Sequence, residues 1–198
     1  MEKPKGKRQL QKEATREHII VTAMRVYEEQ GFAVPVGVIA EAAGLAHGSV
    51  FLHFPTKEDL LHCVLERFFK RIAERMHELA PARDDIPALL REFLAIIEEY
   101  EPFYKHLVTE IHALPPDTQN MLVALRSANA RHFEAAMERG IAQGRIKPLP
   151  LHMMFNTWMG LVYYYLQNGD LFAPGKSVIK THKDELVSFY MSLITIGG

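Results

Sequence analysis

Residues 31–60 read GFAVPVGVIAEAAGLAHGSVFLHFPTKEDL and predict two very short helices joined by a glycine turn. The apolar positions at helical spacing are Val36, Ile39, Ala40 and Ala43 in the first helix, and Val50 and Phe54 in the second. Gly44 lies between the two helices, where the left-handed conformation that ends a helix costs Gly little. Helices shorter than about 12 residues are marginal in water on their own. A second short helix that protrudes from its support is typical of the helix-turn-helix, which enters the major groove of DNA.

The rest of the chain has helical periodicity nearly throughout, and we predict an all-α fold of about nine helices. The helices expected beside the short pair cover residues 15–31, 57–79, 86–100, 102–113, 117–140, 151–168 and 180–195. Thr15 is expected to cap the first of these and Thr56 the second, because a Thr hydroxyl can accept a hydrogen bond from a free backbone N–H. Residues 168–175 are expected to form a loop, since they contain Asn-Gly and Pro-Gly pairs.

Charge is distributed unevenly along the 198 residues, although the formal net charge is only −1. Between Lys3 and Arg16 there are six basic residues and one acid. Residues 42–57 contain no acid, which fits contact with DNA phosphates, although a stretch of this length also occurs by chance. The single cysteine, Cys63, excludes an internal disulfide and indicates a reducing, cytoplasmic environment. The polar N-terminus lacks the apolar segment of a secretory signal. Residues 148–169 carry no charge, but their polar residues favour a buried helix over a membrane span.

Residues 15–65 resemble the TetR family of bacterial transcription regulators. The matching residues are Thr15-Arg16-Glu17, Gly31-Phe32, Ile39-Ala40, Ala43-Gly44, Gly48-Ser49-Val50-Phe51, Phe54, Lys57, Glu58 and Leu60. The remaining two thirds resemble that family in length and helix number only. The resemblance implies a basic flexible arm over residues 1–14, a helix-turn-helix DNA-binding domain over 15–58, and an effector-binding and dimerisation domain over 59–198. It also implies a homodimer that binds a palindromic operator and is not an enzyme.

The resemblance assigns DNA contacts to the second short helix and its surroundings. The implied contact residues are His47, Gly48, Ser49, Phe51, Leu52 and His53, with Lys57 at the start of the next helix and Lys5, Lys7 and Arg8 in the arm. Ser49, Leu52 and His53 are three and four residues apart, so they share the face opposite the apolar side. Ser and His can bond either bases or phosphates, and both alternatives stay open. The sequence departs from the family at three places. Phe51 replaces the usual Tyr, and Ala46 replaces a capping hydroxyl residue. Residues 33–38 are one residue shorter than the common pattern, and Val34 offers no capping hydroxyl before Pro35.

The second half of the chain is rich in aromatic residues and Met, which favours a buried core and, by resemblance, a site for an apolar effector. The candidate effector-binding residues are Phe103, Tyr104, His106, Glu110, Met121, Phe133, Met137, Phe155 and Trp158. Further polar side chains that fall among them are Asn129, His132, Asn156 and Gln167. The alternative is that most of these residues form ordinary core.

Residues 151–168 are apolar on both faces, and only one helix follows them. A helix that is apolar all round must be covered all round. We therefore expect a second copy of the chain to supply the missing cover, in a four-helix interface with two-fold symmetry. The expected interface residues are Leu151, Phe155, Val162, Leu186, Phe189, Tyr190 and Leu193.

Motifs for catalysis, cofactors or metals are weak or missing from this sequence. His62 and Glu66 are four residues apart and have the spacing of a zinc pair, but such a pair more often forms a surface hydrogen bond. We therefore predict a DNA-binding repressor released by a small apolar effector, with no cofactor. Two alternatives remain: a DNA-binding regulator without an effector, and an α-helical enzyme whose first domain only resembles the motif.

Overall fold

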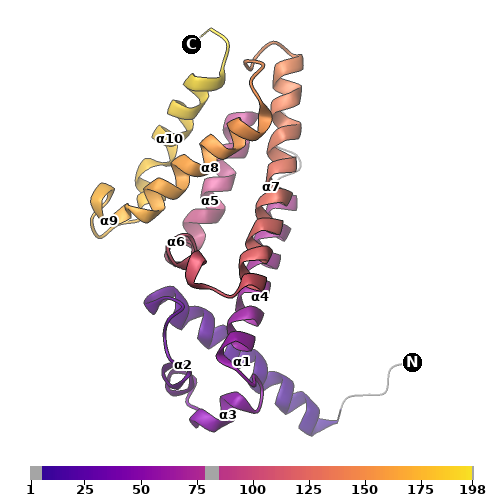
Figure 1. Cartoon of the computed structure of the whole chain (residues 1–198), viewed down its shortest axis with the longest axis vertical. Coiled ribbons are helices and arrows are strands. Elements are labelled where there is room, and N and C mark those ends of the chain that lie inside the picture. The colour runs from indigo at the N-terminus through magenta and orange to yellow at the C-terminus, as the bar shows by residue number, and fades with distance from the viewer. Residues whose placement is uncertain (1–5, 79–84, 198) are drawn as a thin grey trace. The chain divides into compact units, whose positions relative to one another are not determined.

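The computed structural model describes residues 6–78 and 85–197, and confirms the all-α prediction. Within these residues the helices are α1 (Lys7–Gln30), α2 (Val36–Ala42), α3 (His47–Phe51), α4 (Lys57–Glu78), α5 (Ile86–Glu99), α6 (Glu101–Glu110), the 3-10 helix η2 (Ile111–Ala113), α7 (Pro116–Ala142), α8 (Leu151–Gln167), α9 (Gly169–Phe172) and α10 (Val178–Ile194) (Figure 1). The described residues form no β-strand, and one isolated bridge joins Ile146 to Thr195.

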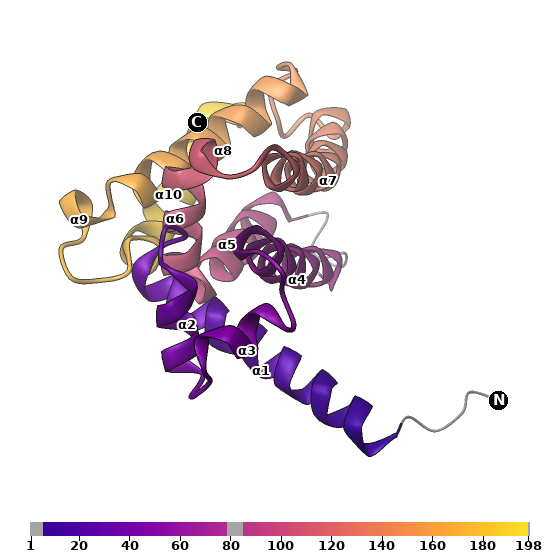
Figure 2. The same ribbon diagram turned by 60° about the horizontal axis from the view of Figure 1, so that its bottom comes forward.

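The chain divides into two compact units, Met1–Phe68 and Phe69–Gly198. The first unit contains α1, α2, α3 and the beginning of α4 (Figure 2). The second unit contains the end of α4 and all later helices. Helix α4 is one continuous helix of 22 residues, so a single element takes part in both cores.

Helix α1 begins at Lys7 and not at Thr15, so the expectation of a flexible arm is wrong for residues 7–14. The Thr15 hydroxyl does not cap the helix; it donates to the Gln11 carbonyl oxygen within it, at 3.0 Å. The residues that follow Gly6 are mostly strong helix formers without Gly or Pro, which explains the early start. Lys5 lies outside the described residues.

Helix α4 is capped as the sequence predicts. The Thr56 hydroxyl oxygen accepts from the Asp59 N–H at 3.0 Å, and an Asp59 carboxylate oxygen accepts from the Thr56 N–H at 3.0 Å. This reciprocal capping box satisfies two backbone donors that the helix itself leaves free. The spacing of Leu60, Val64 and Phe68 in the sequence predicts one apolar stripe on this helix, and all three side chains are fully buried.

The second unit is built around α8 and α10. Helix α10 packs against α5 and α8, and α8 also packs against α6 and α7 (Figure 1). Trp158 of α8 lies at the centre of this core, with its ring centroid 5.1 Å from that of Tyr190 and 6.4 Å from that of Phe93. Among the described residues, no helix is long and apolar enough to cross a bilayer.

Helix α9 was not expected from the sequence, where residues 168–175 read as a loop. It raises the expected nine helices to ten α-helices within the described residues. The Phe172 ring stacks on Tyr165 of α8, with centroids 4.6 Å apart and planes 21° apart. This ring contact gives tertiary support to a helix of four residues, which its own backbone hydrogen bonds would not hold alone.

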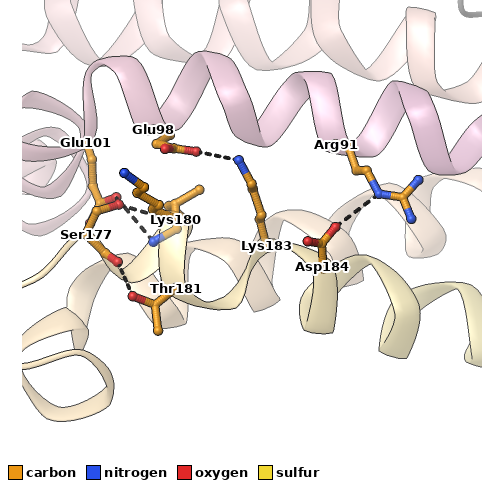
Figure 3. Close-up of polar contacts among 9 residues, drawn as sticks. Arg91, Glu98, Glu101, Ser177, Lys180, Thr181, Lys183 and Asp184 are labelled. Atoms are coloured by element: carbon orange, nitrogen blue, oxygen red, sulfur yellow. Dashed lines mark hydrogen bonds and ion pairs between the residues drawn. The ribbon is translucent and has the colours of Figure 1, made fainter.

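Polar contacts join α10 to α5 and α6 (Figure 3). The Glu101 carboxylate accepts hydrogen bonds from the Ser177 hydroxyl, the Val178 N–H at 2.7 Å and the Ile179 N–H at 3.2 Å. Two ion pairs lie further along α10, Lys183–Glu98 at 3.0 Å and Arg91–Asp184 at 3.2 Å. Glu101 therefore satisfies the free donors at the start of α10 and places its charge at the positive end of that helix.

Replacing Glu101 by Ala should lower the free energy of unfolding by about 2 kcal/mol, because it removes hydrogen bonds to a charged acceptor that is half-buried. The matched control is Arg91→Ala, which breaks an ion pair whose side chains are 49% and 76% exposed. It should cost less than about 1 kcal/mol. Urea unfolding at one fixed protein concentration measures both values. An equal cost for the two variants would contradict this account of Glu101.

Candidate functional site

The turn between α2 and α3 is a Schellman motif. The Leu45 N–H donates to the Ala40 carbonyl at 2.9 Å, and the Gly44 N–H donates to the Glu41 carbonyl at 3.0 Å. Gly44 has φ of +66°, the left-handed conformation that the sequence predicts for it. A side chain with a Cβ would strain this position, so glycine sets the angle at which α3 leaves α2.

Helix α3 has five residues and a sharp division between its two sides. Val50 is 1% exposed and Phe54, just after the helix, is 2% exposed, whereas Leu52 is 79% exposed. His47 and Gly48 are exposed as well, and Ser49 and His53 are half-buried. Ala46 occupies the N-cap without a side-chain hydrogen bond, as the sequence predicts. The apolar side is thus buried in the first unit, and the opposite side faces outward.

Phe51 is partly exposed and lies beside His47. Their ring centroids are 5.0 Å apart and their planes are 88° apart, so the two rings form an edge-to-face pair between residues one helical turn apart. Phe51 is 38% exposed, so its ring edge is open to a ligand, although it has no hydroxyl to donate. The pair joins the first and last residues of α3 by side-chain packing.

His53 combines a buried ring nitrogen with a positive environment. Its Nδ1 atom is buried, and no described residue forms a hydrogen bond with it. Burial, then the nearby charges of Lys12 and Arg16, lower the pKa of the His53 imidazole below its ordinary value of 6.5. The neutral imidazole is therefore favoured, and a nearby phosphate would act in the opposite direction and favour the charged form.

Lys12 was not among the predicted contact residues, yet its charge acts on His53 beside α3. Arg8, Lys12 and Arg16 recur every four residues, so they follow one face of α1. Lys7 and Arg8 are exposed in the first turn of this helix. The spacing of these basic residues was a usable signal in the sequence, but it carried meaning only once α1 was known to extend back to Lys7.

Three contacts of α1 hold the helix-turn-helix in place. His18 Nε2 donates to the carbonyl oxygen of Ala43 at the end of α2, at 3.0 Å. The Arg16 guanidinium carbon lies 4.8 Å from the centroid of the Phe54 ring, and its Nη2 donates to Cys63 Sγ at 3.0 Å. Arg16 therefore joins α1, the turn after α3 and α4 through one side chain.

Lys57 has a partner inside the first unit. Its ammonium donates to the Ala33 carbonyl oxygen at 2.8 Å, which joins the start of α4 to the segment before α2. A Lys ammonium has three N–H donors, so this bond leaves two for another acceptor. Whether they bind phosphate stays a prediction.

The second unit encloses a small cavity. It is lined by Met76, Leu89, Leu90, Phe93, Asn129, His132, Phe133, Phe155 and Trp158. Its volume of about 20 Å³ is room for about one water molecule. Asn129 is one of the few buried polar residues of the chain, at 6% exposed. The cavity is therefore an apolar space with two polar side chains in its wall.

The structure places three of the nine candidate effector residues in this cavity wall: Phe133, Phe155 and Trp158. The others lie elsewhere: Phe103, Tyr104 and Met137 are buried, Met121 is half-buried, and His106 and Glu110 bond each other at 2.7 Å. Sequence reasoning missed Met76, Leu89, Leu90 and Phe93, which come from α4 and α5. Nothing in their spacing separates them from ordinary core residues.

Four of the expected interface residues are buried within their own chain. Phe155, Val162, Leu186 and Tyr190 are 8%, 0%, 2% and 0% exposed. The neighbouring helices of the same chain cover these four side chains, and their contact with a partner stays a prediction. Phe189 and Leu193 are 53% and 43% exposed, and Leu151 is half-buried. The exposed apolar side chains that the prediction left out include Met153, Tyr164 and Ile196.

A short protruding helix, set by a glycine turn and held on a buried underside, defines the protein as a helix-turn-helix DNA-binding transcription regulator. Residues 19–64 match the family described as bacterial regulatory proteins, tetR family. Residues 79–167 match the tetracyclin repressor-like C-terminal domain. The chain belongs to the TetR family. Regulators of this family bind DNA and ligands, typically as dimers.

Two relatives are similar in sequence. The HTH-type transcriptional regulator AcrR of Shigella flexneri is 34% identical over 87 residues, 43% of this chain and 40% of that protein. The fatty acid metabolism regulator protein of Bacillus subtilis (strain 168) is 24% identical over 175 residues, 82% of this chain and 90% of that protein.

Solved structures share the fold. The transcriptional regulator FadR from Bacillus subtilis in complex with stearoyl-CoA has a TM-score of 0.69 and 18% identity, with 89% of this chain and 97% of that one covered. A regulator from Saccharomonospora viridis in complex with choline has a TM-score of 0.77 and 18% identity, with 93% and 99% covered. The ligands in these two structures differ in charge and size.

The lowered pKa of His53 predicts that stability falls as the pH is lowered through about 6.5. The unfolded chain takes up the proton at the ordinary pKa, before the folded domain does, so acid favours unfolding. His53→Gln should remove this part of the slope of unfolding free energy against pH, and Lys12→Gln should reduce it in part. An NMR titration of the His53 ring that gives a pKa at or above 6.5 would contradict the prediction.

Proposed function

We propose that the protein is a dimeric repressor that binds a palindromic operator and is released by a small effector in its second unit. The outward position of Leu52 carries the DNA-binding part of this proposal. Leu52 is 79% exposed, whereas Val50, two residues earlier, is fully buried, so Leu52 has no role in the core of the unit. In a major groove it packs against a thymine methyl group.

The residues around Leu52 have complementary roles in this proposal. Ser49 and His53 bond base edges or phosphates, and His47 contacts the backbone at the start of α3. A Cβ at Gly48 would have no neighbour within 4 Å, so this exposed glycine leaves room for close approach of a phosphate. Lys7, Arg8 and Lys12 add salt-dependent affinity that does not depend on sequence.

The dimer is proposed to form through the exposed apolar sides of α8 and α10. Met153 and Tyr164 of α8 are 59% and 55% exposed, and Phe189 and Leu193 of α10 are 53% and 43% exposed. These residues belong to two helices that pack against each other. Contact of this surface with a copy of itself gives a two-fold axis, and the same symmetry in the operator is a palindrome.

The effector is proposed to enter the apolar cavity around Trp158. Support comes from the cavity lining and from relatives whose structures contain stearoyl-CoA or choline. At about 20 Å³ the cavity must enlarge to admit such a molecule. Binding then favours one arrangement of the dimer over another, and the repressor loses affinity for DNA by a population shift.

The small cavity volume supports one alternative, a regulator whose DNA affinity does not respond to any effector. An enzymatic role has weaker support, since the similar proteins are named transcriptional regulators. Selection of bound genomic fragments in vitro tests the proposal as a whole. It should recover a palindromic sequence, and failure to recover any enriched sequence would contradict it.

Leu52→Glu should weaken binding to the selected operator at least about tenfold, because it adds a negative charge beside phosphates and removes the methyl contact. Its exposure means that folding should be unaffected. The matched control is Val21→Glu, which adds the same charge at a position of α1 that is 52% exposed. Fluorescence anisotropy of a labelled duplex measures both. Equal affinities of the Leu52 variant and the control would contradict the placement of α3 in the groove.

The double substitution Phe189→Glu and Leu193→Glu should convert the dimer to monomer, because four charges would meet in one apolar interface. Both side chains are exposed in the single chain, so its helix content should stay unchanged. Sedimentation velocity gives the mass and circular dichroism the helix content, with Val21→Glu again as the control. A variant that stays dimeric would show that the interface lies elsewhere.

A further inference from the structure

Two separate spaces of the second unit meet at one side chain. The inner one is the apolar cavity around Trp158. The outer one is an open groove of about 500 Å³, lined from α7 by Val123, Arg126, Ser127, Ala130 and Glu134 and from α8 by His152, Phe155, Asn156, Met159, Gly160 and Tyr163. Among the described residues, Phe155 is the one that lines both spaces. Its ring forms an edge contact with Phe133 of the inner cavity, with centroids 5.5 Å apart.

Arg126 is a positive charge built into the wall of the outer groove. Its Nε donates to the Tyr163 hydroxyl at 3.2 Å, and its guanidinium carbon lies 4.8 Å from the centroid of the same ring. Burial raises the pKa of the Tyr163 hydroxyl above its ordinary value, so the phenol stays neutral and does not neutralise the guanidinium. No carboxylate of the described residues forms an ion pair with Arg126. Its two terminal amino groups therefore keep four N–H donors for a ligand.

The other titratable groups of the groove lie away from Arg126. Glu134 is eight residues further along α7, about 12 Å at the rise of an α-helix. His152 is in the first turn of α8, whereas Tyr163 is in its last turns. A negative ligand group is therefore attracted to the Arg126 end of the groove and repelled from the Glu134 end.

We propose that the effector is an amphipathic anion whose acidic head binds Arg126 in the groove and whose apolar chain enters the Trp158 cavity past Phe155. This inference rests on the proposed effector function and specifies its ligand. Displacement of the Phe155 ring joins the two spaces. The inner cavity of about 20 Å³ must also enlarge, and it then takes the end of the apolar chain while the charged end stays in the groove. The head is a carboxylate or a phosphate, since guanidinium bonds either in a bidentate manner.

The single tryptophan of the chain gives a direct readout of this arrangement. Trp158 is 1% exposed and lines the inner cavity but not the outer groove, so its fluorescence is most sensitive to a quencher in the inner space. We would titrate the full-length protein with 12-bromododecanoate and with 2-bromododecanoate. A bromine at the end of the chain should quench Trp158, and a bromine beside the head should not. Stronger quenching by the second probe, or equal quenching by both, would overturn the proposed orientation.

The charge of the head is tested with probes that share one chain. Dodecanoate should bind more tightly than 1-dodecanol or dodecylamine, and Arg126→Gln should weaken dodecanoate binding at least about tenfold, the loss of hydrogen bonds to a charged group. Binding of 1-dodecanol should not change. The matched control is Arg131→Gln, the same substitution at an exposed position of α7. Comparison of dodecanoate with dodecanoyl-CoA decides between the carboxylate and the phosphate head.

Substitutions that make the side chain at position 155 smaller or larger test whether Phe155 controls entry into the inner cavity. Phe155→Leu should speed the entry of dodecanoate, and Phe155→Trp should slow it, as seen in stopped-flow quenching of Trp158 or, for the Trp variant, in displacement of a bound dye. If Phe155→Leu does not fold, the slower entry into Phe155→Trp alone supports the gate. Unchanged rates in both variants would overturn it.

The experiments distinguish failure of the proposed ligand site from failure of the proposed regulatory function. If the protein binds its selected operator but none of the dodecyl probes, the amphipathic ligand is wrong and DNA-binding regulation stands. If dodecanoate quenches Trp158 and depends on Arg126 but leaves operator affinity unchanged, the site stands and its effector function is wrong. Weakened operator binding in the presence of dodecanoate, and not with Arg126→Gln, is the expected result.

Discussion

Helix α3 has five residues, so the burial of Val50 and Phe54 fixes its position and its own hydrogen bonds contribute little. Neighbouring elements of the first unit support the burial of these two side chains. The Schellman turn at Gly44 sets the direction of α3, and the capped start of α4 supports the chain just beyond it. Arg16 stacks on Phe54 from α1, and His18 donates to the carbonyl oxygen of Ala43, just before Gly44. The buried side chains on one side of α3 hold it in place, so its opposite side can carry Leu52 exposed to solvent.

The same division between a buried and a free side recurs in the second unit. Neighbouring helices of the same chain bury Trp158 and Val162 of α8, whereas Met153 and Tyr164 of α8 stay exposed. Four of the residues expected to contact a second copy are buried within their own chain, whereas Phe189 and Leu193 are exposed. A helix that is apolar all round gives no internal signal of which side its own chain will cover.

Helix α1 shows how much of a binding surface depends on one boundary. With a start at Thr15, its basic residues would belong to a flexible arm without a defined position. With a start at Lys7, Arg8, Lys12 and Arg16 lie on one face of a rigid helix, and the charges of Lys12 and Arg16 reach His53. The same basic residues are present in either case, but only the helix places them together on one face.

The sequence by itself determined the all-α fold, the helix-turn-helix, the turn at Gly44, the cap at Thr56 and the apolar stripe of α4. All of these are local, since they follow from residues three or four apart or from the conformational preference of a single residue. Tertiary structure alone decided which sides of α8 and α10 stay exposed, which residues line the cavity, and that Arg126 lies against Tyr163. Met76, Phe93 and Trp158 come from three different helices, α4, α5 and α8. Periodicity shows which residues share a face of a helix, but only the packing of helices against one another decides what that face meets.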